Sequence, residues 1–197
     1  REARNMVMEL FLADHPKQQV SPDPDSKFWE CSKKLGITQS RFPTRKINKI
    51  NIPDNSHPAM AVNLDACIHC NLCVRACREV QVNDVIGMAG RGSETDVIFD
   101  FNDPMGESSC VACGECIQAC PTGALLPSSI LDLSGDTKTK TADRLVDSVC
   151  PYCGVGCQLT YHIKDDKIIK VEGQNGPANE NRLCVKGRFG FDYIDHP

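Results

Sequence analysis

Twelve of the thirteen cysteines fall into three runs whose spacing is typical of ligands to iron–sulfur clusters. A 4Fe–4S cluster needs four thiolates that converge on its corners, and a C-x2-C-x2-C loop is short enough to reach three of them. Each run supplies four cysteines: Cys67, Cys70, Cys73 and Cys77; Cys110, Cys113, Cys116 and Cys120; and Cys150, Cys153, Cys157 and Cys184. The sequence therefore predicts three 4Fe–4S clusters that carry electrons.

The first two runs form an internal repeat, because every spacing between their cysteines is the same. In two-cluster ferredoxins with this spacing, the fourth cysteine of each run binds the cluster of the other run. We therefore expect a first set of Cys67, Cys70, Cys73 and Cys120, and a second set of Cys110, Cys113, Cys116 and Cys77. Each fourth cysteine is expected at the start of a short helix. Pro121 matches the Cys-Pro ending of the pattern, whereas Arg78 takes that place in the first run.

Zinc is the main alternative metal. A zinc ribbon uses two CxxC pairs, whereas each of the first two runs has four cysteines, so iron–sulfur clusters are favoured there. The third set has the spacing C-x2-C-x3-C-x26-C, for which zinc is a fair competitor when the run is taken alone. His69 lies inside the first loop, but four cysteines are already available. We expect His69 beside the cluster or at the surface rather than bound to iron.

The composition favours metal sites over disulfides and over a large apolar core. Aromatic residues make up 6% of the chain, with a single tryptophan, Trp29, and small domains with poor cores commonly depend on metals or disulfides. Neighbouring cysteines within a run are too close to join distant loops, their number is odd, and residues 1–12 lack a signal-peptide pattern. Bunched cysteines in an intracellular setting indicate metal ligands.

Charge and hydropathy point away from nucleic acids and membranes. The formal net charge is −4. Residues 33–49 hold six cations and no acid, which we interpret as a solvated surface or a contact with another part of a larger protein. No stretch approaches the roughly 20 apolar residues of a membrane-spanning helix. Both ends of the sequence look like interior positions of a longer chain.

Short elements are expected to position the cysteines. Met6, Val7, Leu10 and Phe11 share one face of a helix that should end before a proline at position 16. A second helix is predicted at residues 27–35, ended by Gly36. Two hairpins are predicted, at residues 85–88 with 97–101 and at residues 159–163 with 169–171. Residues 132–144 are polar and are expected to form a linker.

The third run and its surroundings resemble a known family. The segments concerned are Val149-Cys-Pro-Tyr-Cys-Gly-Val-Gly-Cys157, the hairpin over residues 159–172, and Arg182-Leu-Cys-Val-Lys-Gly-Arg188. They resemble the N-terminal iron–sulfur domain of molybdenum or tungsten bis-molybdopterin enzymes, which include formate dehydrogenases and nitrate reductases. With the ferredoxin repeat before it, the arrangement looks like the alpha subunit of cytoplasmic formate dehydrogenases, most of them NAD-linked.

The resemblance covers the chain from about residue 57 and implies an α+β fold. A two-cluster bacterial ferredoxin-like domain would occupy residues 57–129, a linker residues 130–144, and the small 4Fe–4S domain of molybdopterin oxidoreductases residues 145–197. A partly irregular helical segment, residues 1–56, would precede them. The implied cofactors are three 4Fe–4S clusters and a molybdenum or tungsten bis-molybdopterin guanine dinucleotide, bound mostly by the rest of the chain. Lys186 would lie between the third cluster and the pterin, and the catalytic residues would lie outside residues 1–197.

The resemblance also implies a reaction and a partner. Formate would be oxidised to carbon dioxide, or the reverse, and electrons would pass from the third set through the ferredoxin pair to a partner subunit. That partner would carry flavin and bind NAD, or be a ferredoxin or a hydrogenase, in the cytoplasm. The main rival is a non-catalytic electron wire, as in the large peripheral-arm subunit of respiratory complex I or a hydrogenase subunit. Nitrate reductase is a rival within the enzymes, and the setting of Lys186 favours a pterin enzyme over a wire.

The N-terminal segment departs from the family pattern. Relatives of this kind carry one histidine and three cysteines here, which bind a further 4Fe–4S cluster. Residues 8–16, with His15, look like the approach to that site, but Gln19 and a Ser/Pro/Asp loop follow where cysteines are expected, and only Cys31 remains. Because two ligands cannot fill four positions, we expect this cluster to be missing. His15 would then be a helix-end residue and Cys31 a buried thiol.

Overall fold

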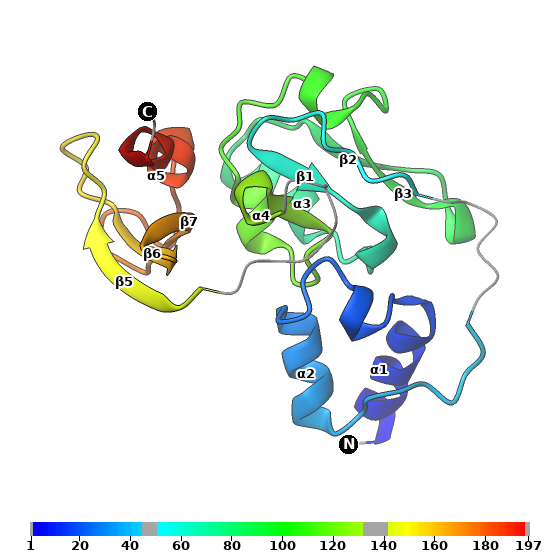
Figure 1. Ribbon diagram of the computed structural model, residues 1–197. Coiled ribbons are helices and arrows are strands. Elements are labelled where there is room, and N and C mark those ends of the chain that lie inside the picture. Colours follow the sequence, from blue (N-terminus) through cyan, green and yellow to red (C-terminus); the bar gives the residue numbers. More distant parts are fainter. Residues whose placement is uncertain (1, 45–50, 132–141, 196–197) are drawn as a thin grey trace.

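The computed structural model describes residues 2–44, 51–131 and 142–195. Most of the predicted linker, and Arg45, Lys46 and Lys49 of the basic stretch, lie outside the described residues. Three units are seen in Figure 1: an N-terminal helical unit, a central unit that carries the first two cysteine runs, and a C-terminal unit built on a three-stranded sheet. Short 3-10 turns occur at Gln18–Val20, Leu64–Ala66, Gly92–Glu94, Met105–Glu107, Ser128–Ile130 and Gly190–Asp195.

The N-terminal unit consists of helices α1 (Glu2–Asp14) and α2 (Lys27–Leu35). Helix α2 ends as predicted, because Gly36 adopts the left-handed conformation (φ 72°) and its N–H donates to the last carbonyls. The buried cluster is formed by Met8, Phe28 and Trp29. The four apolar residues of α1 that share one face, Met6, Val7, Leu10 and Phe11, are exposed, and Met8 joins the core.

The central unit is closed by its two ends. Strand β1 (Met60–Val62) pairs antiparallel with β4 (Leu125–Pro127), which lies after the second run. Between them the predicted hairpin is present, as β2 (Ile86–Ala89) and β3 (Asp96–Phe99). Helix α3 (Leu72–Arg75) continues into a wider helical turn (Ala76–Val80), and α4 (Glu115–Ala119) is its counterpart in the second repeat. Side chains from all these elements form one apolar cluster that includes Cys77 and Cys116.

The C-terminal unit contains β5 (Arg144–Val149), β6 (Gln158–Lys164), β7 (Lys167–Gly173) and helix α5 (Val185–Phe189). The predicted hairpin is β6–β7, whose turn residues Asp165 and Asp166 have positive φ. The sequence prediction missed β5 and placed its first residue, Arg144, in the linker. All six residues of β5 are exposed, so its apolar residues show no burial alternation that could have revealed a strand.

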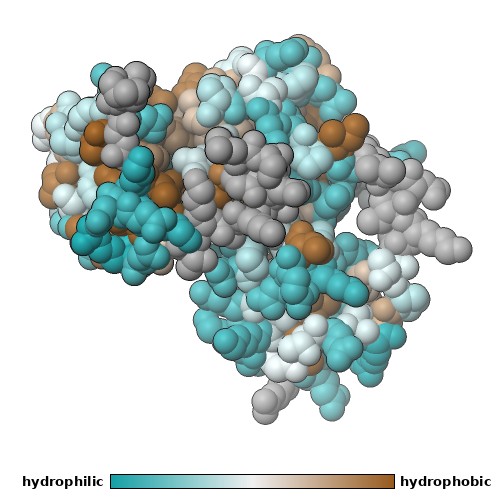
Figure 2. Space-filling view, viewed as in Figure 1, coloured by the Kyte–Doolittle hydropathy of each residue, from teal (hydrophilic) through white to brown (hydrophobic). Residues whose placement is uncertain are grey.

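The units differ in how many hydrophobic side chains they expose at the surface. Figure 2 shows a largely hydrophilic N-terminal unit, while hydrophobic side chains reach the surface at several places on the unit at the left. Leu145, Val146, Val149 and Val155 are among its exposed residues. Within the described residues, no helix combines the length and the hydropathy needed to cross a bilayer.

Candidate iron–sulfur centres

The first loop is shaped by two left-handed residues. His69 (φ 52°) and Asn71 (φ 64°) reverse the chain between the cysteines. The backbone N–H of His69 then donates to Sγ of Cys67 at 3.4 Å, while its ring is exposed. His69 therefore contacts Cys67 through its backbone N–H rather than through its imidazole. Its exposed ring agrees with the predicted surface position.

The second loop repeats this geometry at equivalent positions. Ala112 (φ 55°) and Gly114 (φ 71°) are left-handed, and the N–H of Ala112 donates to Sγ of Cys110 at 3.4 Å. The internal repeat thus extends from cysteine spacing to backbone conformation. Amide groups that point at cluster sulfurs are a means of tuning the reduction potential.

The position of the helices corrects one prediction. Helices α3 and α4 begin directly after the left-handed Asn71 and Gly114, so the third cysteine of each run, not the fourth, lies in the first turn. Cys77 lies in the continuation of α3, and Cys120 directly follows the last residue of α4. The reason is that the left-handed residue turns the chain into the helix one position after the second cysteine.

The four cysteines of the first set surround one pocket with about 380 Å³ of empty space, open solvent included: Cys67, Cys70, Cys73 and Cys120. Burial raises the pKa of Cys73 to about 12, with a smaller contribution from the charge of neighbouring thiolates, first that of Cys120. Burial likewise raises the pKa of Cys67 to about 11, against a smaller opposing effect of the His69 N–H. The structure therefore brings Cys120 to the first run, as the crossed pattern predicts.

The second set surrounds a separate pocket of about 300 Å³, again with open solvent included: Cys77, Cys110, Cys113 and Cys116. Cys116 is buried, and this raises its pKa well above the usual value, with further contributions from the other thiols. The N–H of Val85 donates to Sγ of Cys77 at 3.3 Å, and Nδ2 of Asn83 lies 3.8 Å from Sγ of Cys113. Sequence reasoning missed Asn83, because nothing in its local pattern marks a side chain that faces another run.

The third set has more exposed cysteines than either of the first two sets. Cys150 is buried and Cys157 partly buried, whereas Cys153 and Cys184 are exposed. The N–H of Cys150 donates to the carbonyl of Cys157 at 2.8 Å, and Cys157 and Cys184 line one open surface pocket. Burial, and then the charges of Cys150, Cys153 and Cys184, raises the pKa of Cys157. Lys186 is exposed on α5, and Cys184 is the residue that precedes this helix.

Cys184 is brought back to its run by a braced loop. Asn179 is buried, and its Nδ2 lies 3.0, 3.1 and 3.0 Å from the carbonyl oxygens of Gln158, Gln174 and Arg182. Its Oδ1 accepts from the backbone N–H of Gln158 at 3.0 Å. One side chain therefore ties the start of β6 to the loop that leads to Cys184, a role that the sequence did not reveal.

The donor sets fit 4Fe–4S clusters. Each of two pockets is lined by four cysteines. Burial raises the pKa of Cys67, Cys73, Cys110, Cys116 and Cys157, so these thiols stay protonated unless a cation replaces the protons. Iron would supply that charge. In the described ranges, no three His, Cys, Asp or Glu side chains are arranged to hold a single metal ion.

The N-terminal unit lies against the first set. Ile68, between two cysteines of the first loop, packs on the aromatic cluster of this unit. The N–H of Phe28 donates to the carbonyl of Pro121 at 2.9 Å, directly after Cys120. The ring of His15 stacks on Phe28 with centroids 4.2 Å apart, and burial lowers the His15 pKa.

The predictions for His15 and Cys31 of this unit have different outcomes. His15 directly follows α1, and its N–H donates to the carbonyl of Phe11 at 3.0 Å, so it is a helix-end residue. Cys31 was expected to be buried, but it is exposed. The buried positions of α2 are Phe28, Trp29 and Ser32, which leaves Cys31 on the outer face.

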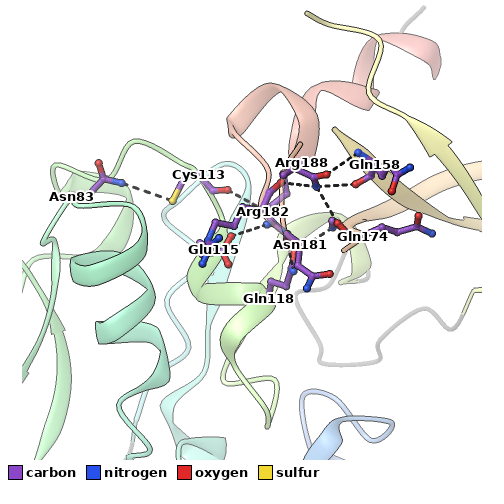
Figure 3. Close-up of polar contacts among 11 residues, drawn as sticks. Asn83, Cys113, Glu115, Gln118, Gln158, Gln174, Asn181, Arg182 and Arg188 are labelled. Atoms are coloured by element: carbon purple, nitrogen blue, oxygen red, sulfur yellow. Dashed lines mark hydrogen bonds and ion pairs between the residues drawn. The ribbon is translucent and has the colours of Figure 1, made fainter. Parts of the chain in front are cut away.

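The C-terminal unit lies against the second set through α4. Gln118 donates from Nε2 to the carbonyl of Asn181 at 2.6 Å and accepts from the N–H of Gly173 at 3.3 Å. Nearby, Arg188 of α5 contacts Cys113 and Glu115 (Figure 3). The C-terminal unit therefore touches the second set at Cys113, and the N-terminal unit touches the first set at Ile68 and at Pro121, next to Cys120.

Comparisons with known proteins agree with this architecture. Residues 66–124 match the 4Fe-4S dicluster domain, and residues 143–196 match the molybdopterin oxidoreductase Fe4S4 domain. A crystal structure of an NAD+-reducing [NiFe]-hydrogenase in the H2-reduced state aligns with a TM-score of 0.59 and 22% identity, over 71% of this chain and 58% of that chain. This likeness concerns the fold.

Among curated proteins, a subunit of NADH-quinone oxidoreductase from Rhizobium meliloti is 33% identical over 98% of this chain and 22% of its own length. The NADPH-Fe(3+) oxidoreductase subunit alpha of Geobacter sulfurreducens is 30% identical over 98% and 22%. A provisionally named formate dehydrogenase of Staphylococcus haemolyticus is 31% identical over 66% and 17%. The chain spans about a fifth of the length of these relatives. It therefore contains a 4Fe-4S dicluster domain followed by the Fe4S4 domain of molybdopterin oxidoreductases, which together are an iron–sulfur electron-transfer module of that family.

Proposed function

We propose that this module carries electrons in a cytoplasmic formate dehydrogenase, from a molybdenum or tungsten bis-pterin centre to a partner subunit. The observation that carries the proposal is the spatial order of the three cysteine sets. Arg188 of the C-terminal unit contacts Cys113 of the second set, and Phe28 of the N-terminal unit contacts Pro121, which follows Cys120 of the first set. Electrons would enter at the third set, pass to the second and first sets, and leave toward the partner.

The residues of the chain would divide the work as follows. Cys67, Cys70, Cys73 and Cys120 would hold the first cluster, Cys77, Cys110, Cys113 and Cys116 the second, and Cys150, Cys153, Cys157 and Cys184 the third. The amides of His69, Ala112 and Val85 would donate to cluster-bound sulfur. The bis-pterin metal, when bound, supplies the two-electron oxidation of formate. Lys186 would lie between the third cluster and the pterin, where its cation offsets the negative charge of the cluster.

Two lines support formate dehydrogenase over the other bis-pterin enzymes. The dicluster domain precedes the Fe4S4 domain, in the order that resembles the formate dehydrogenase alpha subunit, and a relative with that provisional name is 31% identical. In this proposal residues 1–56, 57–129 and 145–197 are separate domains. The partner carries flavin and binds NAD, or is a ferredoxin or a hydrogenase.

A second candidate is a non-catalytic electron wire. The NADH-quinone oxidoreductase relative matches 98% of the chain at 33% identity, which is more of the chain than the formate dehydrogenase relative matches. The same three cysteine sets would serve such a wire equally well. The enzyme would bind a pterin beside Lys186, whereas the electron wire would not.

Metal analysis of the full-length protein, purified without oxygen, tests the proposal. Three clusters require about 12 iron atoms in these domains, and the enzyme requires about one molybdenum or tungsten per chain. Formate-dependent reduction of a dye should then depend on that metal. Iron without molybdenum or tungsten would support the wire, and zinc in place of iron would refute both functions.

A further inference from the structure

Arg188 is a buried cation at the boundary between the central and C-terminal units. Its side chain is 3% exposed. Its Nε donates to the carbonyl oxygen of Cys113 at 3.0 Å, and its Nη2 lies 3.4 Å from Oε2 of Glu115 (Figure 3). Burying a guanidinium is costly even when it is paired, so a residue held in this way calls for a specific role.

The backbone of Arg188 is connected to the third set. Its N–H donates to the carbonyl of Cys184 at 3.1 Å, in the first turn of α5. A single residue therefore joins Cys184 to Cys113 through its own covalent bonds and two hydrogen bonds. Cys113 belongs to the second set, so Arg188 bridges two sites between which an electron must pass.

The second loop is adapted to receive this side chain. A Cβ at position 114 would lie 2.1 Å from Cδ of Arg188, so glycine at Gly114 leaves the space that Arg188 fills. The equivalent residue of the first loop is Asn71, which is exposed. The close approach of Arg188 is thus a feature of the second repeat and not of the ferredoxin loop in general.

We propose that Arg188 is the positioning residue for electron transfer between the third and the second cluster, because its fork fixes the backbone of Cys113 relative to Cys184. The inference rests on the proposed electron path and applies to the enzyme and to the wire alike. A lysine would keep the charge, but it lacks the rigid fork that reaches a carbonyl and a carboxylate together.

The test compares Arg188→Lys with Arg144→Lys in the full-length protein purified without oxygen. Arg144 is a matched control, because it also pairs with a carboxylate, Asp166, at 3.0 Å, but on the exposed strand β5. We measure iron content, the magnetic interaction between the two clusters by electron paramagnetic resonance after dithionite reduction, and the rate of electron transfer between them. Arg188→Lys should keep its iron, weaken the interaction and slow transfer about 10- to 100-fold, whereas Arg144→Lys should match the parent.

An Arg188→Lys protein with the parent's interaction and rate would overturn the inference. If this variant loses iron, Glu115→Gln decides. Its amide oxygen can still accept from Nη2 of Arg188, so the fork keeps both contacts and interaction and rate should stay close to the parent. Values as low as expected for Arg188→Lys would assign the effect to the charge of the ion pair and overturn positioning by the fork. A parent protein with clusters but no formate activity refutes the formate dehydrogenase proposal alone, because the magnetic interaction still decides the role of Arg188. A parent without clusters refutes both.

Discussion

The two cysteine loops of the central unit share a backbone but face different neighbours. In each loop the residues two and four positions after the first cysteine are left-handed, and the first of them donates its N–H to that cysteine at 3.4 Å. The first loop meets the aromatic cluster of the N-terminal unit through Ile68. The second loop meets the C-terminal unit through Arg188. The two loops therefore share the backbone conformation that points an amide at a cysteine. The residues between the cysteines differ, and they fit the unit that packs against each loop.

Equivalent helix positions show the same divergence. Arg75 of α3 is exposed and pairs with Glu79 at 3.0 Å within its own helical segment. Its counterpart in α4 is Gln118, which reaches Asn181 and Gly173 in the C-terminal unit. A repeat that is symmetric in its ligands is thus asymmetric in its contacts, because only the α4 half reaches the C-terminal unit through this position.

The largest expected effect comes from removing a cysteine ligand from the second set, compared with removing one from the first set. Cys113→Ser should lower iron by about four atoms per chain and slow electron delivery to the partner, because in the proposed path the second cluster accepts electrons from the third. Cys70→Ser should lower iron equally, but electrons should still reach the second cluster. Iron analysis and single-turnover reduction of each cluster check both variants. Unaffected partner reduction in Cys113→Ser would show that the path is drawn wrongly.

The next effect concerns the neighbour of the first loop. Phe28→Ala should destabilise the N-terminal unit by about 3–5 kcal/mol, the usual cost of emptying a buried phenylalanine site, and should leave iron bound in the other units. Trp29 fluorescence during denaturation reports on this unit alone, because Trp29 is the single tryptophan. Phe101→Ala is the control, since Phe101 is 96% exposed and its loss should change stability by no more than about 0.5 kcal/mol. Equal midpoints for the two variants would contradict the proposed packing.

Exchanging the left-handed residues sharpens the comparison further. Gly114→Asn keeps a residue type that tolerates positive φ but places a side chain against Arg188, and should destabilise by about 1–3 kcal/mol through overpacking. Asn71→Gly at the exposed equivalent position should change stability by less than about 1 kcal/mol. Thermal loss of visible cluster absorbance compares the two proteins. If Gly114→Asn proves as stable as the parent, the second loop does not need glycine for Arg188.

The smallest effect is expected at the helix positions. Gln118→Ala leaves the N–H of Gly173 and the carbonyl of Asn181 without their partner and should cost about 1 kcal/mol. Arg75→Ala breaks an exposed pair on one helical segment and should cost no more than about 0.5 kcal/mol. Denaturant midpoints followed by circular dichroism should separate the two. A reversed order would mean that the interface contributes less than the surface pair.

The sequence predicted the features that depend on local spacing. The cysteine repeat, α2 with its Gly36 cap and both hairpins follow from short-range geometry, and the structure has them. The crossed grouping follows from the ligand pattern of two-cluster ferredoxins, and the two pockets group the cysteines in the same way. The fold class is confirmed by the matching domains.

The features that depend on contacts between units could not be predicted. Strand β5 is set by pairing with β6 rather than by a pattern of burial. Nothing near Arg188 or Asn83 distinguishes them from surface residues, because their partners lie in another run of the chain. Cys31 shows the opposite error, because a buried thiol was expected and the fold leaves it exposed.

The crossing of the first and second sets has a consequence for the order of synthesis. Cys67, Cys70 and Cys73 leave the ribosome early, but the pocket that they share is complete only once Cys120 has followed. The second set needs Cys77 from the older half of the same unit. With crossed ligation, neither cluster can be finished while the unit is half made. Insertion of both clusters would then wait for one event, the pairing of β1 with β4, which closes the unit.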